Sequence, residues 1–333
     1  MRGFGFLSSA VLALGLSLSG PALADDLISP KRLALSENTD LPGGDIASIF
    51  DTTLEACETA CLTNKQCQAF TFNTKNGACF PKSSAGEGEY FEGAYSGYVI
   101  KAEKGVEGRA QTRRAELTFL PDWDISPATA LAGNLANLHV ANDYSAEDDL
   151  SAARDAEANG DLDSAYRFAG AATTMADTAD NWLEYARLQL EAATRDENNA
   201  SMLRNNAFLS TVNAYLRSEN VAQRHNILVM MGQALELVGR GRDTVQALRL
   251  AQNLQPRDDT AVALDDAIGK YGFRILENVV QSDTDRPRIC VNFSEDLVKS
   301  GVDYSSFVQV PDAGMSVASD GYRQLCVEGG RAR

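Results

Sequence analysis

The sequence predicts an α+β protein of several domains: a small disulfide-bonded α+β module, a helical middle region and an incomplete β-sandwich at the C-terminus. Three observations support this order. Four cysteines cluster between residues 57 and 79, an Ala-rich stretch with helical periodicity fills residues 146–272, and strand-like alternation follows over 275–333. A length of 333 residues is enough for about two or three domains.

Residues 1–24 have the pattern of a cleaved signal peptide. Arg2 gives a positive start, an uncharged apolar run extends from Phe4 to Leu18, and Ala22-Leu23-Ala24 is a small-x-small cleavage pattern. We expect cleavage between Ala24 and Asp25, with an uncleaved anchor as the alternative. The apolar run is too short for a stable bilayer span, and no later stretch is long enough. We therefore expect a periplasmic or secreted chain with no membrane span after cleavage.

The six cysteines fit an oxidising compartment, because an even number in an exported chain favours disulfides. The alternative is a metal site. The clustered cysteines are separated by three, five and eleven residues, unlike the CxxC pairs of zinc sites, and no histidine lies near them in sequence. We therefore expect disulfides and no metal, although four clustered cysteines still allow three pairings.

The local pattern around the cluster narrows the pairing. Thr52-Thr53-Leu54-Glu55 is a capping-box signature and predicts a helix over 53–63. The alternating segment 68–73 predicts a half-buried strand, and 78–80 returns as a second strand after a turn at 75–77. A helix packed on this hairpin has its two cysteines on one face, because positions i and i+4 stack.

This arrangement predicts two disulfides. The packed helix brings Cys57 to Cys79 on the second strand. Cys61 is then left to pair with Cys67 across the helix end.

At these residues the chain resembles the PAN/Apple domain family. The resemblance covers residues 28–102 and rests on Cys-x3-Cys-x5-Cys, on the Ala-Phe-Thr-Phe-Asn strand at 69–73 and on the cysteine that follows. It implies a binding module for protein or carbohydrate, without catalysis.

Residues 103–145 are expected to form a linker. The segment begins with mixed charges and glycine, and Arg113-Arg114 is interpreted as solvent-exposed. The short apolar piece 117–125 is expected to dock against a neighbouring domain. The alternative for Trp123, which lies in this piece, is that its ring stacks on a ligand.

The helical middle, residues 146–272, contains one proline, and its pattern predicts helices at about 146–159, 162–176, from 181, 201–218, 223–238 and 244–254. Segments 159–165 and 239–247 echo each other, each placing a glycine turn before an Ala-rich helix. They resemble tetratricopeptide-like helical hairpins. That family implies a peptide groove, and the alternative is that the alanines serve only close helix packing.

The C-terminal segment changes to strands. Segments 288–293, 307–310, 315–317 and 322–327 alternate, and Asp320-Gly321 is a tight hairpin signal. We expect Cys290 and Cys326 to bridge neighbouring strands.

Segments 290–297 and 325–329 resemble the opening β-domain of bacterial alpha-macroglobulins, and the domain order is similar too. The resemblance implies the N-terminal part of an alpha-2-macroglobulin-like endopeptidase inhibitor. That family uses a Cys-x-Glu-Gln thioester, and here Gly329 stands in place of the Gln, so no functional residue of the family is carried over.

Composition excludes several function classes. With 46 acidic and 30 basic residues the net charge is −16, and so acidic a chain repels nucleic acid. The two histidines, His139 and His225, are few for acid–base or zinc chemistry, and each is interpreted as a packed, hydrogen-bonded residue. HExxH, GxGxxG, Walker and GxSxG motifs do not occur. We expect no enzyme activity, no catalytic residue and no cofactor.

Other candidate residues are interpreted as structural or solvent-exposed rather than functional. Asp258-Asp259 and Asp265-Asp266 are expected to form a solvated acidic face rather than a cation site, and Met230-Met231 to fill the core. The sequence thus predicts an exported, non-enzymatic binding protein, the N-terminal part of a protease inhibitor, whose partners are proteins, proteases among them. The alternative is a protein- or carbohydrate-binding surface module that acts through the PAN/Apple-like domain.

Overall fold

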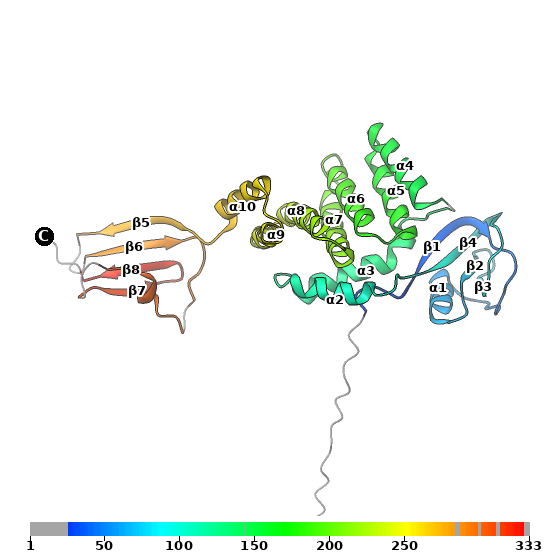
Figure 1. Cartoon of the computed structure of the whole chain (residues 1–333), viewed down its shortest axis with the longest axis horizontal. Coiled ribbons are helices and arrows are strands. Elements are labelled where there is room, and N and C mark those ends of the chain that lie inside the picture. Colours follow the sequence, from blue (N-terminus) through cyan, green and yellow to red (C-terminus); the bar gives the residue numbers. More distant parts are fainter. Residues whose placement is uncertain (1–25, 143, 284–286, 299–300, 311–313, 330–333) are drawn as a thin grey trace, which may run out of the picture.

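The computed structural model describes residues 26–142, 144–283, 287–298, 301–310 and 314–329. Figure 1 shows an N-terminal module at one end, helices in the middle and a β-sheet at the other end. The expected signal peptide, with the Ala24–Asp25 cleavage site, lies outside the described residues. Within the described ranges, no helix is long and apolar enough to cross a membrane.

The N-terminal module is one helix on a four-stranded antiparallel sheet of order β1-β4-β2-β3. Its elements are β1 Lys31–Asp40, α1 Leu54–Thr63, β2 Ala69–Asn73, β3 Ala78–Lys82 and β4 Glu89–Lys101. The side chain of Thr53 caps α1 by accepting a hydrogen bond from the amide of Ala56 at 3.2 Å. The capped helix and the β2–β3 hairpin therefore form from the local patterns that the sequence shows.

The structure contains the disulfides Cys57–Cys79, Cys61–Cys67 and Cys290–Cys326, the same three pairs as in the sequence-based map. The first two join α1 to the hairpin and to the turn that precedes it. The third joins directly opposite positions on two neighbouring strands of the C-terminal sheet. No cysteine in the described part of the chain is free.

The middle of the chain is a stack of helices, which we call the helical unit. Its bounds are α2 Val106–Glu116, α3 Asp122–Leu138, α4 Ala146–Ala158, α5 Leu162–Met175, α6 Ala179–Ala192, α7 Ala200–Arg217, α8 Val221–Leu237, α9 Gly241–Leu254 and α10 Asp258–Tyr271. Sequential pairs α4–α5, α6–α7 and α8–α9 pack against each other as hairpins. The expected helical middle region is thus present.

The expectation of a linker over 103–145 is wrong for most of that segment. It contains α2 and α3, which both pack on α7, and the segment between them buries Leu117 and Leu120 in the main core. The Arg113 side chain is largely buried and donates to Glu116 at 2.8 Å rather than lying free in solvent. The sequence does not predict α2, because that helix is polar on almost every side and buries only Val106 and Ala110.

The N-terminal module and the helical unit share buried contacts. Ala136 of α3 belongs to the core of the module, whereas Leu27 and Ile28 pack on the core of the helical unit. The amide of Ala141 donates to the carbonyl of Leu35 on β1 at 3.0 Å. These contacts fix the module against α3 and create a shared surface between the two parts.

The C-terminal part is a single antiparallel sheet of order β5-β6-β8-β7. Its strands are β5 Ile275–Gln281, β6 Arg288–Phe293, β7 Ser316–Asp320 and β8 Gln324–Glu328. The hairpin at Asp320-Gly321 is present, with Gly321 in the left-handed region. The expected strand at 307–310 is absent. Its first residue instead ends the 3₁₀ turn Tyr304–Phe307, which begins where the Asp303 carboxylate accepts from the Ser305 amide.

Candidate binding cleft

A cleft of about 830 Å³ lies between the N-terminal module and the helical unit. Its walls come from the chain around residues 26–33, from α1, from one face of α3, and from the ends of α5 and α7. The lining includes Arg32, Glu58, Ser126, Thr129, Gly133, Asn137, Asp177, Trp182 and Arg217.

One wall of the cleft is a face of α3. Ser126, Thr129, Gly133 and Asn137 lie three or four positions apart, so they share one side of the helix. Beside Gly133 the space is open, because no atom lies within 4 Å of the position that a Cβ would occupy. This wall therefore offers small polar side chains and room for a ligand.

The opposite wall contains a buried acid. Glu58 of α1 is only 7 % exposed, and its Oε2 accepts from Asn137 Nδ2 at 3.1 Å. Its other oxygen, Oε1, is buried and has no hydrogen-bond partner in the part of the chain that the structure describes. Burial raises the pKa of this carboxyl, against the Asn137 hydrogen bond, which lowers it.

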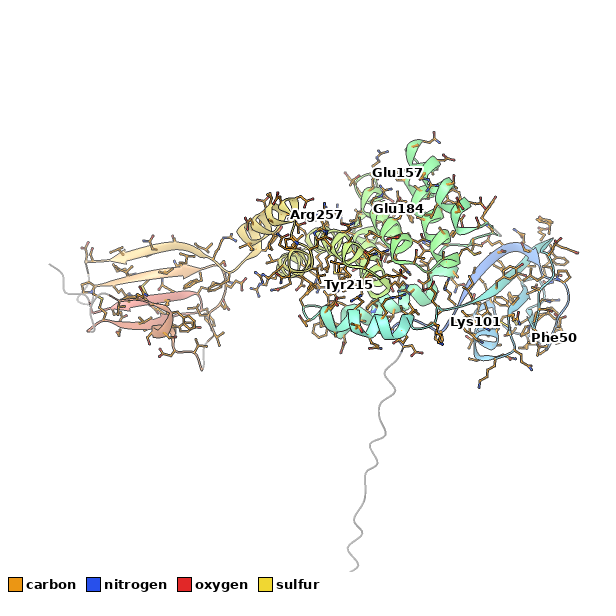
Figure 2. All side chains as sticks on the ribbon, in the orientation of Figure 1. Phe50, Lys101, Glu157, Glu184, Tyr215 and Arg257 are labelled. Carbon is orange, nitrogen blue, oxygen red and sulfur yellow. A yellow bond between two sulfur atoms is a disulfide. The ribbon has the colours of Figure 1, made fainter. Side chains whose placement is uncertain are left out.

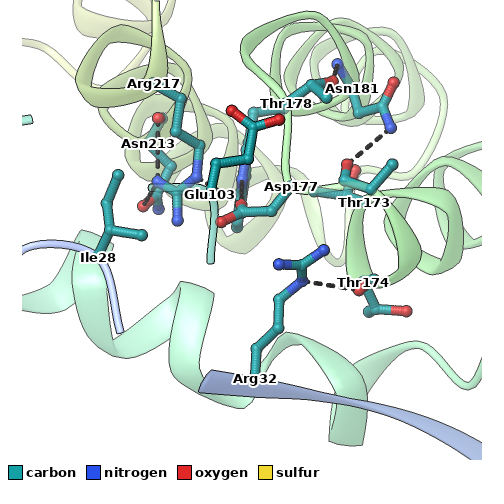
Figure 3. Close-up of polar contacts among 12 residues, drawn as sticks. Ile28, Arg32, Glu103, Thr173, Thr174, Asp177, Thr178, Asn181, Asn213 and Arg217 are labelled. Carbon is teal, nitrogen blue, oxygen red and sulfur yellow. Dashed lines mark hydrogen bonds and ion pairs between the residues drawn. The ribbon is translucent and has the colours of Figure 1, made fainter. Parts of the chain in front are cut away.

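The floor of the cleft is an Arg32–Asp177–Arg217 cluster (Figure 3). Arg32 of β1 donates from Nε to the carbonyl of Thr174 at 3.0 Å and from Nη2 to that of Met175 at 2.9 Å. These are unpaired carbonyls at the C-terminal end of α5, where a cation is favoured. Arg32 therefore connects the N-terminal module to the helical unit.

Asp177 holds the rest of the floor together. Its Oδ1 accepts from Arg217 Nε and, at 2.7 Å, from Trp182 Nε1. Burial alone would raise the pKa of this carboxyl, but the Arg217 guanidinium and its hydrogen bonds keep that pKa below the usual value. Asp177 is thus a charged carboxylate that holds Arg217 and Trp182 in place.

A second cavity of about 360 Å³ adjoins the cleft, and the same three floor residues line it. Glu103 and Arg109 lie on its other side. Arg109 is only loosely paired, with Glu103 at 3.7 Å and with Glu219 at 3.5 Å. Acidic and basic groups therefore alternate around the floor.

The comparison of the sequence with protein-family models decides the nature of the N-terminal module. The model of the PAN domain matches residues 33–104, which span β1 to β4 with both local disulfides. This module is a PAN domain. No curated protein matches the chain. PAN domains bind proteins or carbohydrates, and the cleft lies where this PAN domain meets the helical unit.

The two histidines lie away from the cleft lining. His139 Nε2 is 2.6 Å from the Tyr185 hydroxyl, and burial lowers the pKa of His139 to about 4, with the Arg167 charge adding to the effect. His225 Nε2 lies 3.0 Å from the Thr260 hydroxyl and is buried. Both are packed, hydrogen-bonded residues, in agreement with the sequence-based interpretation.

The remaining candidates are not brought to the cleft lining. Trp123 is 75 % exposed and does not line the cleft. Met231 is buried in the core as expected, whereas Met230 is only half-buried and does not belong to that core. Asp258, Asp259, Asp265 and Asp266 are exposed, as expected for a solvated face. Among the described residues, no group of three His, Cys, Asp or Glu side chains could hold a metal ion.

The sequence analysis missed the cleft residues. Arg32 and Thr174, which are in hydrogen-bond contact, are 142 residues apart in sequence, and neither belongs to a motif. The available signal was local: Thr178 before Asn181 reads as a helix cap, and it places Asp177 next to the start of α6.

Proposed function

We propose that this chain is a binding protein without enzyme activity that acts outside the cytoplasm. It holds a segment of a partner protein in the cleft between the PAN domain and the helical unit. The observation that carries the proposal is the cleft itself, because its volume of about 830 Å³ is in the range of ligand sites and both parts of the protein contribute to it.

The lining favours a peptide over a sugar. Trp182 is the one aromatic residue among those that line this cleft, and it is 1 % exposed. A sugar ring would therefore find no open aromatic face to stack on. Ser126, Thr129 and Asn137 instead provide side-chain oxygens that can accept from the amides of an extended backbone, because their own hydrogens already donate within the protein.

The absence of enzyme activity is part of the proposal. Its support is that His139 and His225 are both buried, and that the described residues lining the cleft include neither histidine nor cysteine. The disulfides support an oxidising compartment, the periplasm or the cell exterior.

The protease-inhibitor role has narrower support. It rests on the likeness of segments 290–297 and 325–329 to macroglobulin β-domains. We therefore propose proteases as one class of partner. The proposed peptide site does not depend on this choice.

The test uses the whole purified chain and a substitution that fills the cleft. Gly133→Phe introduces a ring where the space is open, and Gly269→Phe is the matched control, an exposed helical glycine with open space that does not line the cleft. Both variants are first compared with the parent by circular dichroism. The chains are then selected against random heptapeptides displayed on phage and, in parallel, applied to a glycan array.

We expect selected peptides to bind at least about tenfold more weakly to the Gly133→Phe variant and unchanged to the control. Glycan binding without peptide binding would overturn the proposal in favour of a carbohydrate module. Peptide binding that both variants retain would move the site away from the cleft.

A further inference from the structure

We propose that Arg32 and Arg217 receive a carboxylate of the bound protein segment, so that the cleft selects an acidic side chain or a free C-terminus. This inference rests on the proposed function and names the chemistry by which the site selects its ligand. It is argued from the two guanidiniums at the floor of the cleft (Figure 3).

Each of these guanidiniums has a nitrogen to spare. Nη1 of Arg32 and Nη2 of Arg217 make no hydrogen bond to any described residue, although the other nitrogens of both groups are paired. Both side chains line the cleft. The spare nitrogen of each guanidinium can donate a charge-assisted hydrogen bond to a carboxylate, so the two arginines supply one such donor each.

The two groups are held in place before a ligand arrives. Arg32 is anchored by two carbonyls of α5, and Arg217 by Asp177 and by the Asn213 carbonyl and side-chain oxygen at 3.1 and 3.0 Å. Binding would therefore cost little ordering of these side chains.

The charges at the floor leave room for one more anion. Arg32, Asp177 and Arg217 together carry one net positive charge. Glu103 faces Arg32 from the adjoining cavity, but it also lies near Arg109 and its side chain is mostly exposed. A carboxylate arriving through the cleft would supply the missing negative charge on the buried side of the cluster.

A single carboxylate fits this site better than a polyanion. Exposed Asp26 and Asp122 also line the cleft, and the chain as a whole has a net charge of −16. These negative charges repel polyanions such as nucleic acids or sulfated polysaccharides. A ligand with a single carboxylate is repelled less and can still contact Arg32 and Arg217.

The cleft has a second polar group, the Glu58–Asn137 pair, and its distance from the arginines sets the length of the ligand. Asn213, next to Arg217 on the last turns of α7, donates to the carbonyl of Ala128 on α3 at 2.6 Å. Glu58 accepts from Asn137, nine residues further along α3, which is about 14 Å at 1.5 Å per residue. An extended peptide covers that span with about four residues. Glu58, which lines the cleft, therefore marks the other end of this span.

The experiment compares matched tetrapeptides on the full chain by titration calorimetry. The probes are acetyl-Ala-Ala-Glu-Ala-amide, its Gln counterpart, which has the same shape without the charge, and acetyl-Ala-Ala-Ala-Ala with a free C-terminal carboxylate. Comparison of the amidated Glu peptide with the tetra-alanine peptide that has a free C-terminus shows whether a side-chain or a terminal carboxylate is preferred. Arg32→Lys and Arg217→Lys keep the positive charge but remove the spare guanidinium N–H groups. Arg187→Lys is the control, since Arg187 pairs with Glu157 and Glu184 and does not line the cleft. Figure 2 labels these two glutamates.

We expect one of the carboxylate peptides to bind at least about tenfold more tightly than the Gln peptide. Both cleft variants should lose this preference and the Arg187→Lys control should keep it. Equal binding of the charged and uncharged peptides, sensitive to Gly133→Phe, would overturn the carboxylate site and leave the peptide cleft standing. A preference that survives both cleft variants would also overturn it, and a failure of every peptide to bind would overturn the two proposals together.

Discussion

His139 packs directly on Gly170, and a Cβ at position 170 would lie 2.3 Å from the imidazole Cδ2 atom. The ring follows α3, and the glycine lies in the middle of α5. The Tyr185 hydroxyl, on α6, lies 2.6 Å from Nε2 of the same ring. One buried imidazole thus links three helices close to the PAN domain, and its contact with Gly170 leaves no space for a side chain.

We expect Gly170→Ala to destabilise the protein by about 1–3 kcal/mol through overpacking. An alanine in an exposed helix interior would instead stabilise it by up to about 1 kcal/mol. Gly133→Ala, where the space is open, is therefore the control and should be neutral or stabilising. Urea denaturation measures both variants, and equal midpoints would contradict the packing argument.

The second prediction concerns pH and Asp149. This α4 residue is 2 % exposed, and its Oδ2 has no partner among the described residues. Burial raises its pKa to about 7, and the neighbouring Asp148 adds to the shift. Between the unfolded value near 3.8 and about 7, the folded state binds more protons than the unfolded state. Asp149 therefore makes the free energy of unfolding fall as pH rises through that range.

Asp149→Asn removes this titration. We expect the variant to gain stability relative to the parent as pH rises from 5 to 8, and to keep that gain above pH 8. Thermal melts of both chains across this range measure it, with Asp155→Asn, an exposed position on the same helix, as the control. A stability difference that does not change with pH would rule out the raised pKa.

Elements that form from local sequence patterns were predicted, whereas elements stabilised by distant contacts were not. The cap at Thr53 and the alternation in Ala69–Asn73 act within a few residues, so α1 and the β2–β3 hairpin followed from the sequence. Helix α2 did not, because its stability comes from packing on α7 rather than from an amphipathic pattern. The strand at β5 was missed for a similar reason, since its Ile-Leu-Glu-Asn-Val-Val-Gln sequence does not alternate.

The floor of the cleft shows the same limit for function. Arg32 looks like an ordinary strand residue in the sequence, and Arg217 like the ordinary last residue of a helix. Only the fold brings them to one cavity with Asp177. A single sequence contains no local mark of such a contact.

The third prediction concerns the disulfides. Mapping of peptides under non-reducing conditions should find Cys57–Cys79, Cys61–Cys67 and Cys290–Cys326, without free thiols. A Cys57–Cys61 link, or zinc bound at stoichiometric amounts, would contradict the map. Converting both Cys290 and Cys326 to Ser should cost about 3–4 kcal/mol, because the bridge closes a loop with a sequence separation of 36.

The last prediction tests whether segment 103–145 is a packed part of the protein. Leu120 lies between α2 and α3, is 1 % exposed and packs in the main core. We expect Leu120→Ala to cost about 2–5 kcal/mol, because it removes buried methyl groups and leaves a cavity. Leu138→Ala, at a half-exposed position at the end of α3, is the matched control and should change stability by only about 0.5 kcal/mol. A flexible linker would tolerate both substitutions equally. Equal urea midpoints for the two variants would therefore restore the linker interpretation and remove α3 as a fixed wall of the cleft.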